Sequence, residues 1–213
     1  MPVPLEELVD KRTLLMPWSV DQYHHLIAAG FLPEGEPYEL LDGLMVRKDR
    51  TAAGEDPLTV GHEHAFAVDR LAGLRPKLER LGCYIRIQQP ITLPPYDEPE
   101  PDGAIVLGTE EDYAARHPGA KDVLCVIEVA DASLARDRTA KLRIYADSGL
   151  PQYVIVDLGD RTAEVYRAPL KGKRRYGQSI TLTASQMLEL PGAERKSLSV
   201  RVRRFFPLAQ RRK

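Results

Sequence analysis

Two acidic residues and one lysine stand where a charge is costly unless it has a chemical use. Asp102 follows Pro101 and opens an apolar run, Glu128 lies inside the apolar stretch 123–129, and Lys141 follows in a segment expected to be helical. An unpaired charge in a buried strand is strongly unfavourable unless a metal ion or a counter-charge meets it. Two carboxylates and a nearby lysine are the groups that metal-assisted hydrolysis of a phosphodiester requires. The pattern therefore predicts a nuclease-type site.

The elements that must position these residues follow from the spacing of apolar and turn-forming residues. Strands are predicted at 83–88, 104–107, 123–129, 153–157 and 164–167, and a hairpin at 38–46. Helices are predicted at 20–27, 61–81 and 133–148, a loop at 51–57, and short strands and turns from 173 to 202. Pro76 is expected to kink or split the second helix. Strands that alternate with helices predict an α/β fold built on a mixed sheet.

Length and composition favour one globular domain. The chain has 213 residues, of which 43% are hydrophobic, and no apolar run approaches the roughly 20 residues that span a bilayer. Its N-terminal residues lack the apolar stretch of a signal peptide. Cys83 and Cys125 lie in apolar, strand-like runs, which favours reduced core thiols over a disulfide or a zinc site. We therefore expect a soluble, cytoplasmic protein.

The charge is distributed unevenly along the chain. Residues 1–168 hold 18 Lys and Arg against 29 Asp and Glu, whereas residues 169–213 hold 12 against 2. A basic turn is formed by Lys171, Lys173, Arg174 and Arg175. Such a segment could grip the phosphates of a nucleic acid. It could equally keep a hairpin soluble or dock on the acidic face of the same protein, and charge counting leaves both interpretations open.

The order of several short motifs resembles a known family. The motifs are Tyr38-Glu39-Leu40-Leu41-Asp42-Gly43, then Glu100-Pro101-Asp102, then Val126-Ile127-Glu128-Val129, then Asp137-Arg138 with Lys141, Tyr145 and residues 149–157. Over about residues 14–170 they resemble the Uma family of “putative restriction endonucleases”, a branch of the PD-(D/E)xK nuclease superfamily. The resemblance implies one restriction-endonuclease-like domain over 1–213, with a mixed sheet flanked by helices. Its core would span 14–170, and residues 171–213 would be a basic elaboration with an antiparallel hairpin region.

The resemblance also implies roles for individual residues. It implies that Glu39, Asp102 and Glu128 bind Mg²⁺ or Mn²⁺, and that Lys141 is the catalytic cation. Hard cations prefer oxygen ligands, and three clustered carboxylates repel one another unless a cation lies between them. Tyr145, one helical turn after the lysine, could then hydrogen-bond the scissile phosphate.

The chain departs from the family pattern near the second acid. A standard superfamily site has a lysine two residues after that acid, where this chain has Ala130. The family tends to have a Leu-Ser pair where Ala130-Asp131 stands, and it often has Trp where Val154 stands. No proposed ligand is lost by these changes, although Asp131 adds a negative charge near the site.

Each candidate also has a plainer interpretation. Glu39 could be a solvent-facing hairpin residue, and Asp102 could be a turn residue. Lys141 could pair with Asp137, four residues earlier, on an exposed helix face. Glu128 is the hardest to explain in this way, because its neighbours in the strand are apolar.

Other polar residues are given secondary roles. His62 and His64 open a predicted helix, where capping or contact with a partner is favoured over metal binding. Asp157 and Glu164 are interpreted as sheet-edge residues. Arg138, together with Arg136 and the C-terminal arginines, could help to position a substrate.

These observations lead to one principal hypothesis and two others. The principal hypothesis is a Mg²⁺- or Mn²⁺-dependent endonuclease that hydrolyses phosphodiester bonds, with DNA as the expected substrate and RNA left open. A homodimer is expected, because double-strand cleavage by this fold usually calls for two active sites. The first alternative is a catalytically inactive nucleic-acid-binding or protein-interaction module of the same fold. The second is a small-molecule phosphodiesterase, which would need a closed pocket in place of an open cleft.

Overall fold

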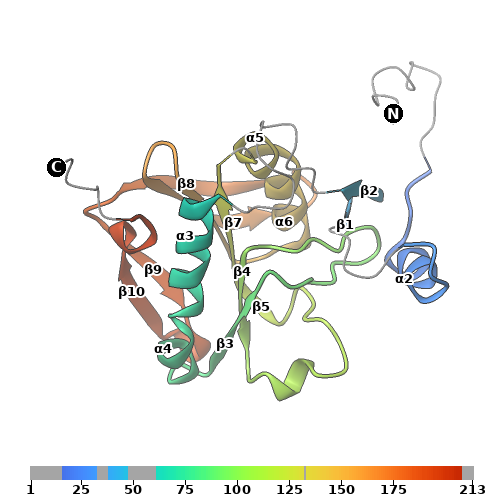
Figure 1. The fold of residues 1–213 in the computed structure, drawn as a ribbon, viewed down its shortest axis with the longest axis horizontal. Coiled ribbons are helices and arrows are strands. Elements are labelled where there is room, and N and C mark those ends of the chain that lie inside the picture. The colour runs from blue at the N-terminus through green and yellow to red at the C-terminus, as the bar shows by residue number, and fades with distance from the viewer. Residues whose placement is uncertain (1–15, 33–37, 48–60, 132, 208–213) are drawn as a thin grey trace.

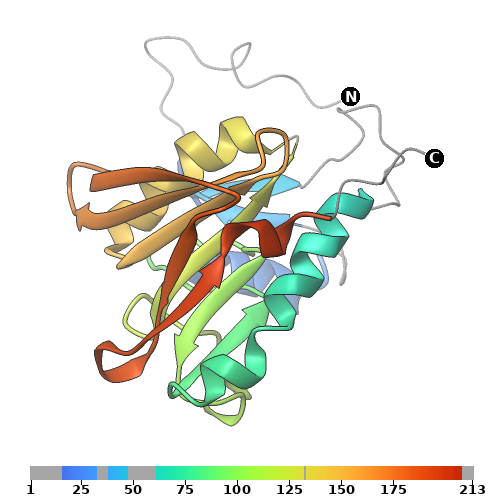
Figure 2. The same ribbon diagram turned by 90° about the vertical axis from the view of Figure 1, so that its left-hand side faces the viewer.

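A six-stranded mixed sheet forms the centre of the computed structural model, which describes residues 16–32, 38–47, 61–131 and 133–207 (Figures 1 and 2). The strands, in their order across the sheet, are β3 (Cys83–Ile87), β4 (Gly103–Leu107), β5 (Val123–Ala130), β6 (Gln152–Asp157), β7 (Thr162–Leu170) and β8 (Arg175–Thr183). Only β5 and β6 are parallel among these neighbouring pairs. The α/β fold and mixed sheet expected from the sequence are therefore confirmed.

The parallel pair β5 and β6 requires a crossover, and three consecutive helical segments supply it. They are α5 (Leu134–Arg136), the π-helical turn η3 (Asp137–Lys141) and α6 (Leu142–Ser148). Gly149 ends α6 in the left-handed conformation at φ 77°, where a glycine carries no Cβ penalty. The predicted helix at 133–148 thus exists, but with a wider turn that ends at Lys141.

One face of the sheet is covered by helices α3 (His62–Ala72) and α4 (Arg75–Glu79). Leu71, Leu74 and Leu78 are fully buried against alternate residues of the strands, including Ile85 and Ile127. The predicted helix at 61–81 is split at residues 73–74, just before Pro76. A two-stranded ribbon, β9 (Met187–Pro191) and β10 (Ser197–Arg201), adds residues to the same core.

The opposite face carries α6 and a second apolar cluster. Ile144 and Tyr145 of α6 are buried there with Val126 of β5 and Ile155 of β6. Because side chains alternate along a strand, Glu128 lies on this same face, two residues after Val126. The crossover helix is therefore the element that covers the buried acid.

A separate hairpin joins this second face. Strands β1 (Tyr38–Leu41) and β2 (Leu44–Arg47) pair through the turn Asp42-Gly43, as expected, with φ 51° and 73°. The backbone of Leu40 exchanges hydrogen bonds with that of Glu98, which attaches the hairpin to the loop before β4. Helix α2 (Val20–Ala28), with a capping box between Ser19 and Gln22, packs beside it. This attachment brings Glu39 towards the sheet.

Several expectations about the fold need correction or completion. Strand 83–88 ends at Ile87, because Gln88 turns the chain at φ 48°. After residue 173, β9 and β10 are the short strands expected, whereas β8 has nine residues and pairs with the nine residues of β7. Cys83 and Cys125 are buried free thiols, as expected. The loop predicted at 51–57 lies outside the described residues, and no helix in the described ranges has the length and apolarity needed to span a membrane.

Asp97, beside the β1–β2 turn, gives a prediction about pH. Its Oδ1 accepts the backbone N–H of Asp42 at 2.6 Å, and burial raises its pKa to about 6. A carboxyl group whose pKa is higher in the folded state makes the fold less stable as the pH rises. The loss begins near the unfolded pKa of about 4 and continues to the folded pKa of about 6. Asp97→Asn should therefore increase the free energy of unfolding by about 1–2 kcal/mol at pH 8.

Urea unfolding of Asp97→Asn at pH 8 and pH 3 measures this gain in the free energy of unfolding, which should vanish at pH 3. An equal gain at both pH values would contradict the assignment, and the exposed Asp69→Asn serves as the control.

Candidate active site

The register of the sheet places the two predicted acids next to each other. Gly103 of β4 pairs with Ile127 of β5, so Asp102, just before β4, lies opposite Glu128. The backbone N–H of Val129 donates to Asp102 Oδ2 at 2.9 Å, which fixes the carboxylate across β5. The sequence prediction that these acids stand on neighbouring strand ends agrees with this geometry.

Lys141 joins Glu128 to Glu39. Its Nζ lies 2.9 Å from Glu128 Oε1 and 3.0 Å from Glu39 Oε1. The side chain of Lys141 is 3% exposed, that of Glu128 5% and that of Glu39 0%. The backbone N–H of Glu100 donates to Glu39 Oε1 at 2.8 Å and holds it in place. Glu39, Asp102, Glu128 and Lys141 are called the carboxylate cluster below.

The burial of these groups rules out two of the plainer interpretations. Glu39 is not a solvent-facing hairpin residue, because its whole side chain is enclosed. Lys141 does not form an exposed pair with Asp137, because both residues are buried in η3, at 3% and 1% exposure. Lys141 instead directs its charge into the carboxylate cluster.

Tyr145 contacts Glu128 directly. Its hydroxyl donates to Glu128 Oε1 at 2.8 Å, and its ring packs edge-on against Tyr153 at 4.9 Å between centroids. Tyr145 is fully buried. The structure therefore shows it orienting the second acid, and the contact with a phosphate expected from the sequence stays a prediction.

Three residues near the cluster were not assigned to it from the sequence. His64 Nε2 lies 3.2 Å from Asp102 Oδ1, and Gln88 Nε2 donates to the same oxygen at 3.3 Å. Asp137 is buried one turn before Lys141, and Ser133 Oγ donates to its Oδ2 at 2.6 Å. Within the described part of the chain, Asp137 Oδ1 has no hydrogen-bond partner. In the sequence, Asp137 stands in the family motif Asp137-Arg138 and four residues before the lysine, but neither feature gave it a role in the site.

Burial and neighbouring charges set the protonation of the cluster. Burial raises the pKa of Glu128 to about 7; Lys141 opposes the rise, and Asp137, Asp102 and Glu39 add to it. For Lys141, burial lowers the pKa, but Glu128, Glu39 and Asp137 together outweigh it and hold the pKa above its usual range. Burial also acts to raise the pKa of Asp102, but His64 and the Val129 N–H keep it below its usual range. At neutral pH, Asp102 is thus ionised and Lys141 is charged.

The basic turn 171–175 connects β7 to β8. Within the described ranges, its hydrogen bonds and ion pairs are made with residues outside the carboxylate cluster. Gly172 N–H donates to Asp147 Oδ1 at 2.7 Å, and Arg174 pairs with Asp42 in the β1–β2 turn. The side chain of Lys171 packs so closely on Gly149 that a Cβ there would collide with it. Among the described residues, no hydrogen bond or ion pair links this turn to the carboxylate cluster. Docking on the protein's own acids is observed, and contact with phosphates stays a prediction.

Arg138 has partners that the sequence did not indicate. It pairs with Asp157 at 3.2 Å and with Glu164, whose carboxylate also accepts the Tyr166 hydroxyl at 2.5 Å. Asp157 and Glu164 are buried on the interior strands β6 and β7, so their interpretation as sheet-edge residues is wrong. This ion pair ties the start of the crossover to the sheet, which fixes the position of η3.

A mixed sheet with two acids on adjacent strands, and a buried lysine on the crossover between its parallel strands, defines the class of restriction-endonuclease-like folds. The sequence model of the Uma2 family, described as “Putative restriction endonuclease”, matches residues 20–203, and the chain belongs to this family. The match extends past the predicted limit of 170 and includes the β9–β10 ribbon.

One solved structure supports the fold. It is a protein of Anabaena variabilis titled a “putative nuclease belonging to DUF820”, with a TM-score of 0.64 and 17% sequence identity. The similarity covers 89% of this chain and 98% of that chain. A search of curated proteins gave no significant match. At this level of identity, the likeness supports the architecture and leaves the chemistry to the residues.

Proposed function

We propose that the protein is a metal-dependent endonuclease that hydrolyses phosphodiester bonds, with DNA as its substrate. The observation that carries the proposal is the carboxylate cluster itself, in which a buried lysine lies between Glu39 and Glu128, and Asp102 lies opposite Glu128 on the neighbouring strand. The family to which the chain belongs, described as “Putative restriction endonuclease”, supports the same reaction. The carboxylates of the cluster lie close together although like charges repel, which favours a chemical role for them over a structural one.

The donor atoms of the cluster suit a hard divalent cation. All are carboxylate oxygens, and the raised pKa of Glu128 reflects burial beside three other acids, a cost that a cation would relieve. No three acidic, histidine or cysteine side chains in the described ranges already converge as a preformed metal site. We assign Asp102 and Glu128 as the residues that would hold Mg²⁺ or Mn²⁺, with Glu39 as the third ligand. When bound, the cation would neutralise developing charge on the phosphate and lower the pKa of the attacking water.

The residues of the chain would divide the remaining tasks. Lys141 would stabilise the charge that develops on the phosphate oxygens, because it stays protonated and lies between two of the acids. Tyr145 would keep Glu128 in a fixed orientation, and His64 and Gln88 would do the same for Asp102. These are positioning residues, since each acts through an acid that it contacts.

The substrate contacts and assembly are also part of the proposal. Lys171, Lys173 and Arg175 are exposed, and they could meet backbone phosphates, whereas Arg174 would first have to leave Asp42. A homodimer would present one active site to each strand of a duplex. Sedimentation of the protein with and without duplex DNA would reveal whether two copies assemble.

Metal binding tests the proposal apart from cleavage. Titration of Mn²⁺ into the protein, followed by calorimetry, should show binding that Asp102→Ala weakens by more than about 100-fold, since loss of a residue that only orients a ligand costs about 10–100-fold. Asp69→Ala, on the exposed side of α3, is the matched control and should bind as the unaltered protein does. Equal binding by all three proteins would remove Asp102 from the site. No binding by any would favour the alternative of a module that keeps the fold without turnover.

A further inference from the structure

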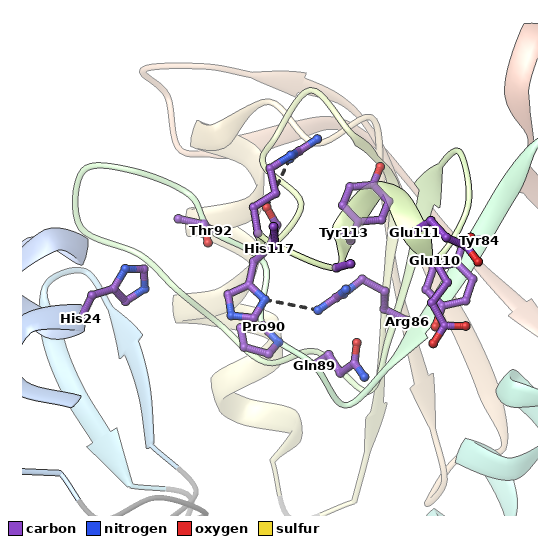
Figure 3. Close-up of a pocket in the computed structure, with 13 residues that line it drawn as sticks. His24, Tyr84, Arg86, Gln89, Pro90, Thr92, Glu110, Glu111, Tyr113 and His117 are labelled. Carbon is purple, nitrogen blue, oxygen red and sulfur yellow. Dashed lines mark hydrogen bonds between the residues drawn. The ribbon is translucent and has the colours of Figure 1, made fainter. Parts of the chain in front are cut away.

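A polar pocket lies beside strand β3, at the far edge of the sheet from β8. It has a volume of about 1030 Å³, and its lining includes Tyr84, Arg86, Glu110, Tyr113, Arg116 and His117 (Figure 3). Asp102, Glu128 and Lys141 do not line it. The pocket is therefore a separate place on the molecule from the carboxylate cluster.

Arg86 is a buried cation without an acidic partner. The residue is 7% exposed, and within the part of the chain that the structure describes its guanidinium forms no ion pair. Its Nε has no acceptor there, and its Nη2 donates only to His117 Nδ1, at 3.3 Å. Arg116 and Arg138, by contrast, each pair with a carboxylate. Because a buried charge without an ion pair costs free energy, Arg86 is poised for an anion that the described part of the chain does not supply.

His117 fixes the orientation of the Arg86 guanidinium. A guanidinium can only donate hydrogen bonds, so Nδ1 of His117 must accept, and the proton of the neutral ring then resides on Nε2. Burial, reinforced by Arg86 against the opposing pull of Glu98, lowers the pKa of His117, which keeps the ring neutral at pH 7. Because the two ring nitrogens point in diverging directions, the Nε2–H points away from Arg86 (Figure 3). The N–H groups of the guanidinium that His117 does not occupy are therefore the donors for an oxyanion.

The other charges around the pocket leave this end open to an anion. Arg116 is held by Asp122 at 2.6 Å, and His24 is held by Glu98 at 2.8 Å. Glu110 and Glu111 line the pocket, but Figure 3 shows the Arg86 guanidinium pointing to His117 and away from both. The acids therefore bound the far side of the pocket, and the donors define the near side.

The position of Arg86 relates the pocket to the carboxylate cluster. Arg86 pairs with Ala104, and Ala104 pairs with Val126, two residues before Glu128. Strands about 4.8 Å apart with about 3.3 Å per residue put the Arg86 and Glu128 backbones about 12 Å from each other. Arg86 also alternates with Tyr84, whose side chain belongs to the same apolar cluster as Val126, so both charges lie on one face of the sheet. A bound nucleic-acid strand covers this distance in a few nucleotides.

We propose that Arg86, held in place by His117, forms an oxyanion site that takes a phosphate group, a few nucleotides along the strand from the carboxylate cluster. The phosphate would come from a strand end, as a monoester, or from the interior of the strand, as a diester. The source of the phosphate rests on the proposed nuclease function. Oxyanion binding at Arg86 does not, because it needs neither metal nor turnover.

Thermal unfolding in EDTA tests the site with inorganic phosphate as the probe. Phosphate at ten times its Kd should raise the Tm by about 3–6 °C relative to chloride at equal ionic strength. Arg86→Met should lose this response without becoming less stable in chloride, because it removes an unpaired buried charge. Arg75→Met, at a partly exposed arginine that stacks on Tyr84 and does not line the pocket, is the control and should keep the response. His117→Ala removes the acceptor that orients the guanidinium and should reduce the response even if Arg86→Met fails to fold.

Single-stranded oligonucleotides with and without a 5′-phosphate separate the two sources, by fluorescence anisotropy in EDTA. A monoester site predicts about tenfold tighter binding of the phosphorylated strand, a difference that Arg86→Met removes. A diester site predicts equal binding of both strands and a similar loss for both in the variant. The proposal is overturned if phosphate does not stabilise the unaltered protein, or if Arg86→Met and His117→Ala respond as it does. Such a failure would leave Mn²⁺ binding and cleavage untouched, and loss of cleavage would leave this response untouched.

Discussion

Lys141→Met is expected to destabilise the fold and to abolish cleavage together. The variant leaves Glu39 and Glu128 buried without the ammonium group that now lies within 3.0 Å of both. Breaking a buried pair by removal of one partner costs about 3–5 kcal/mol, and we expect a loss of this size in the free energy of unfolding at pH 8. The pKa of Glu128 would rise further, because Lys141 now lowers it. The loss should therefore shrink as the pH falls from 8 to 5, where Glu128 can be protonated.

Urea unfolding at the two pH values measures this effect. Lys77→Met, on the exposed side of α4, is the matched control and should change stability by less than about 0.5 kcal/mol. A Lys141→Met protein that is as stable as the control at pH 8 would show that the lysine does not neutralise the buried acids. Full cleavage activity in the variant would remove Lys141 from the chemistry.

Glu128→Gln should separate activity from stability. The glutamine keeps an oxygen to accept the hydrogen bonds of Lys141 and Tyr145, and Glu39 still neutralises the lysine. Burial raises the pKa of Glu128 to about 7, so ionisation of this group at higher pH lowers the free energy of unfolding. Glutamine cannot ionise and removes this loss. We expect the free energy of unfolding at pH 8 to change by less than about 1 kcal/mol. Cleavage should fall by at least about 10²-fold, because a metal ligand and its charge are lost.

Rates of plasmid nicking at saturating metal, measured alongside urea unfolding, check both parts of this prediction. Glu79→Gln, at the exposed end of α4, is the control for the loss of a negative charge and should cleave normally. A large loss of stability with unchanged cleavage would mean that Glu128 is a structural residue. The contrast with Lys141→Met is the specific signature of the carboxylate cluster.

Asp102 and Glu128 could be identified from the sequence because their positions conflict with their surroundings, whereas the role of Glu39 was implied only by the family resemblance. Glu128 is a charge inside an apolar strand, and Asp102 opens the neighbouring strand after a proline. The hairpin turn Asp42-Gly43 fixed the pairing that puts Glu39 on β1. These features depend on local patterns of period two and on turn chemistry, which a single sequence carries.

The contacts of the cluster could not be predicted in the same way. Lys141 faces the acids because a π-helical turn widens the crossover, and no residue pattern in the segment indicates that turn. His64 comes from α3, and Gln88 from the end of β3, and both meet Asp102 only through the packing of distant segments. The buried partners of Arg138 likewise depend on the order of strands in the sheet.

The distribution of charged residues was the least informative feature of the sequence. It identified the basic turn but could not decide between phosphate and protein as its partner, and the structure shows Arg174 on Asp42. The charge distribution also gave no sign of the role of Arg86, which depends on its burial without an ion pair among the described residues. An arginine in an alternating strand is unremarkable until its burial and its neighbours are known.

Cleavage of supercoiled plasmid and of single-stranded DNA tests the central claim most directly. The protein would be incubated with Mg²⁺, with Mn²⁺ and with EDTA, beside Glu128→Gln. The account predicts nicking or linearisation that requires the divalent ion and disappears in the variant. Cleavage that survives in EDTA, or that Glu128→Gln retains, would contradict an active site built on these carboxylates.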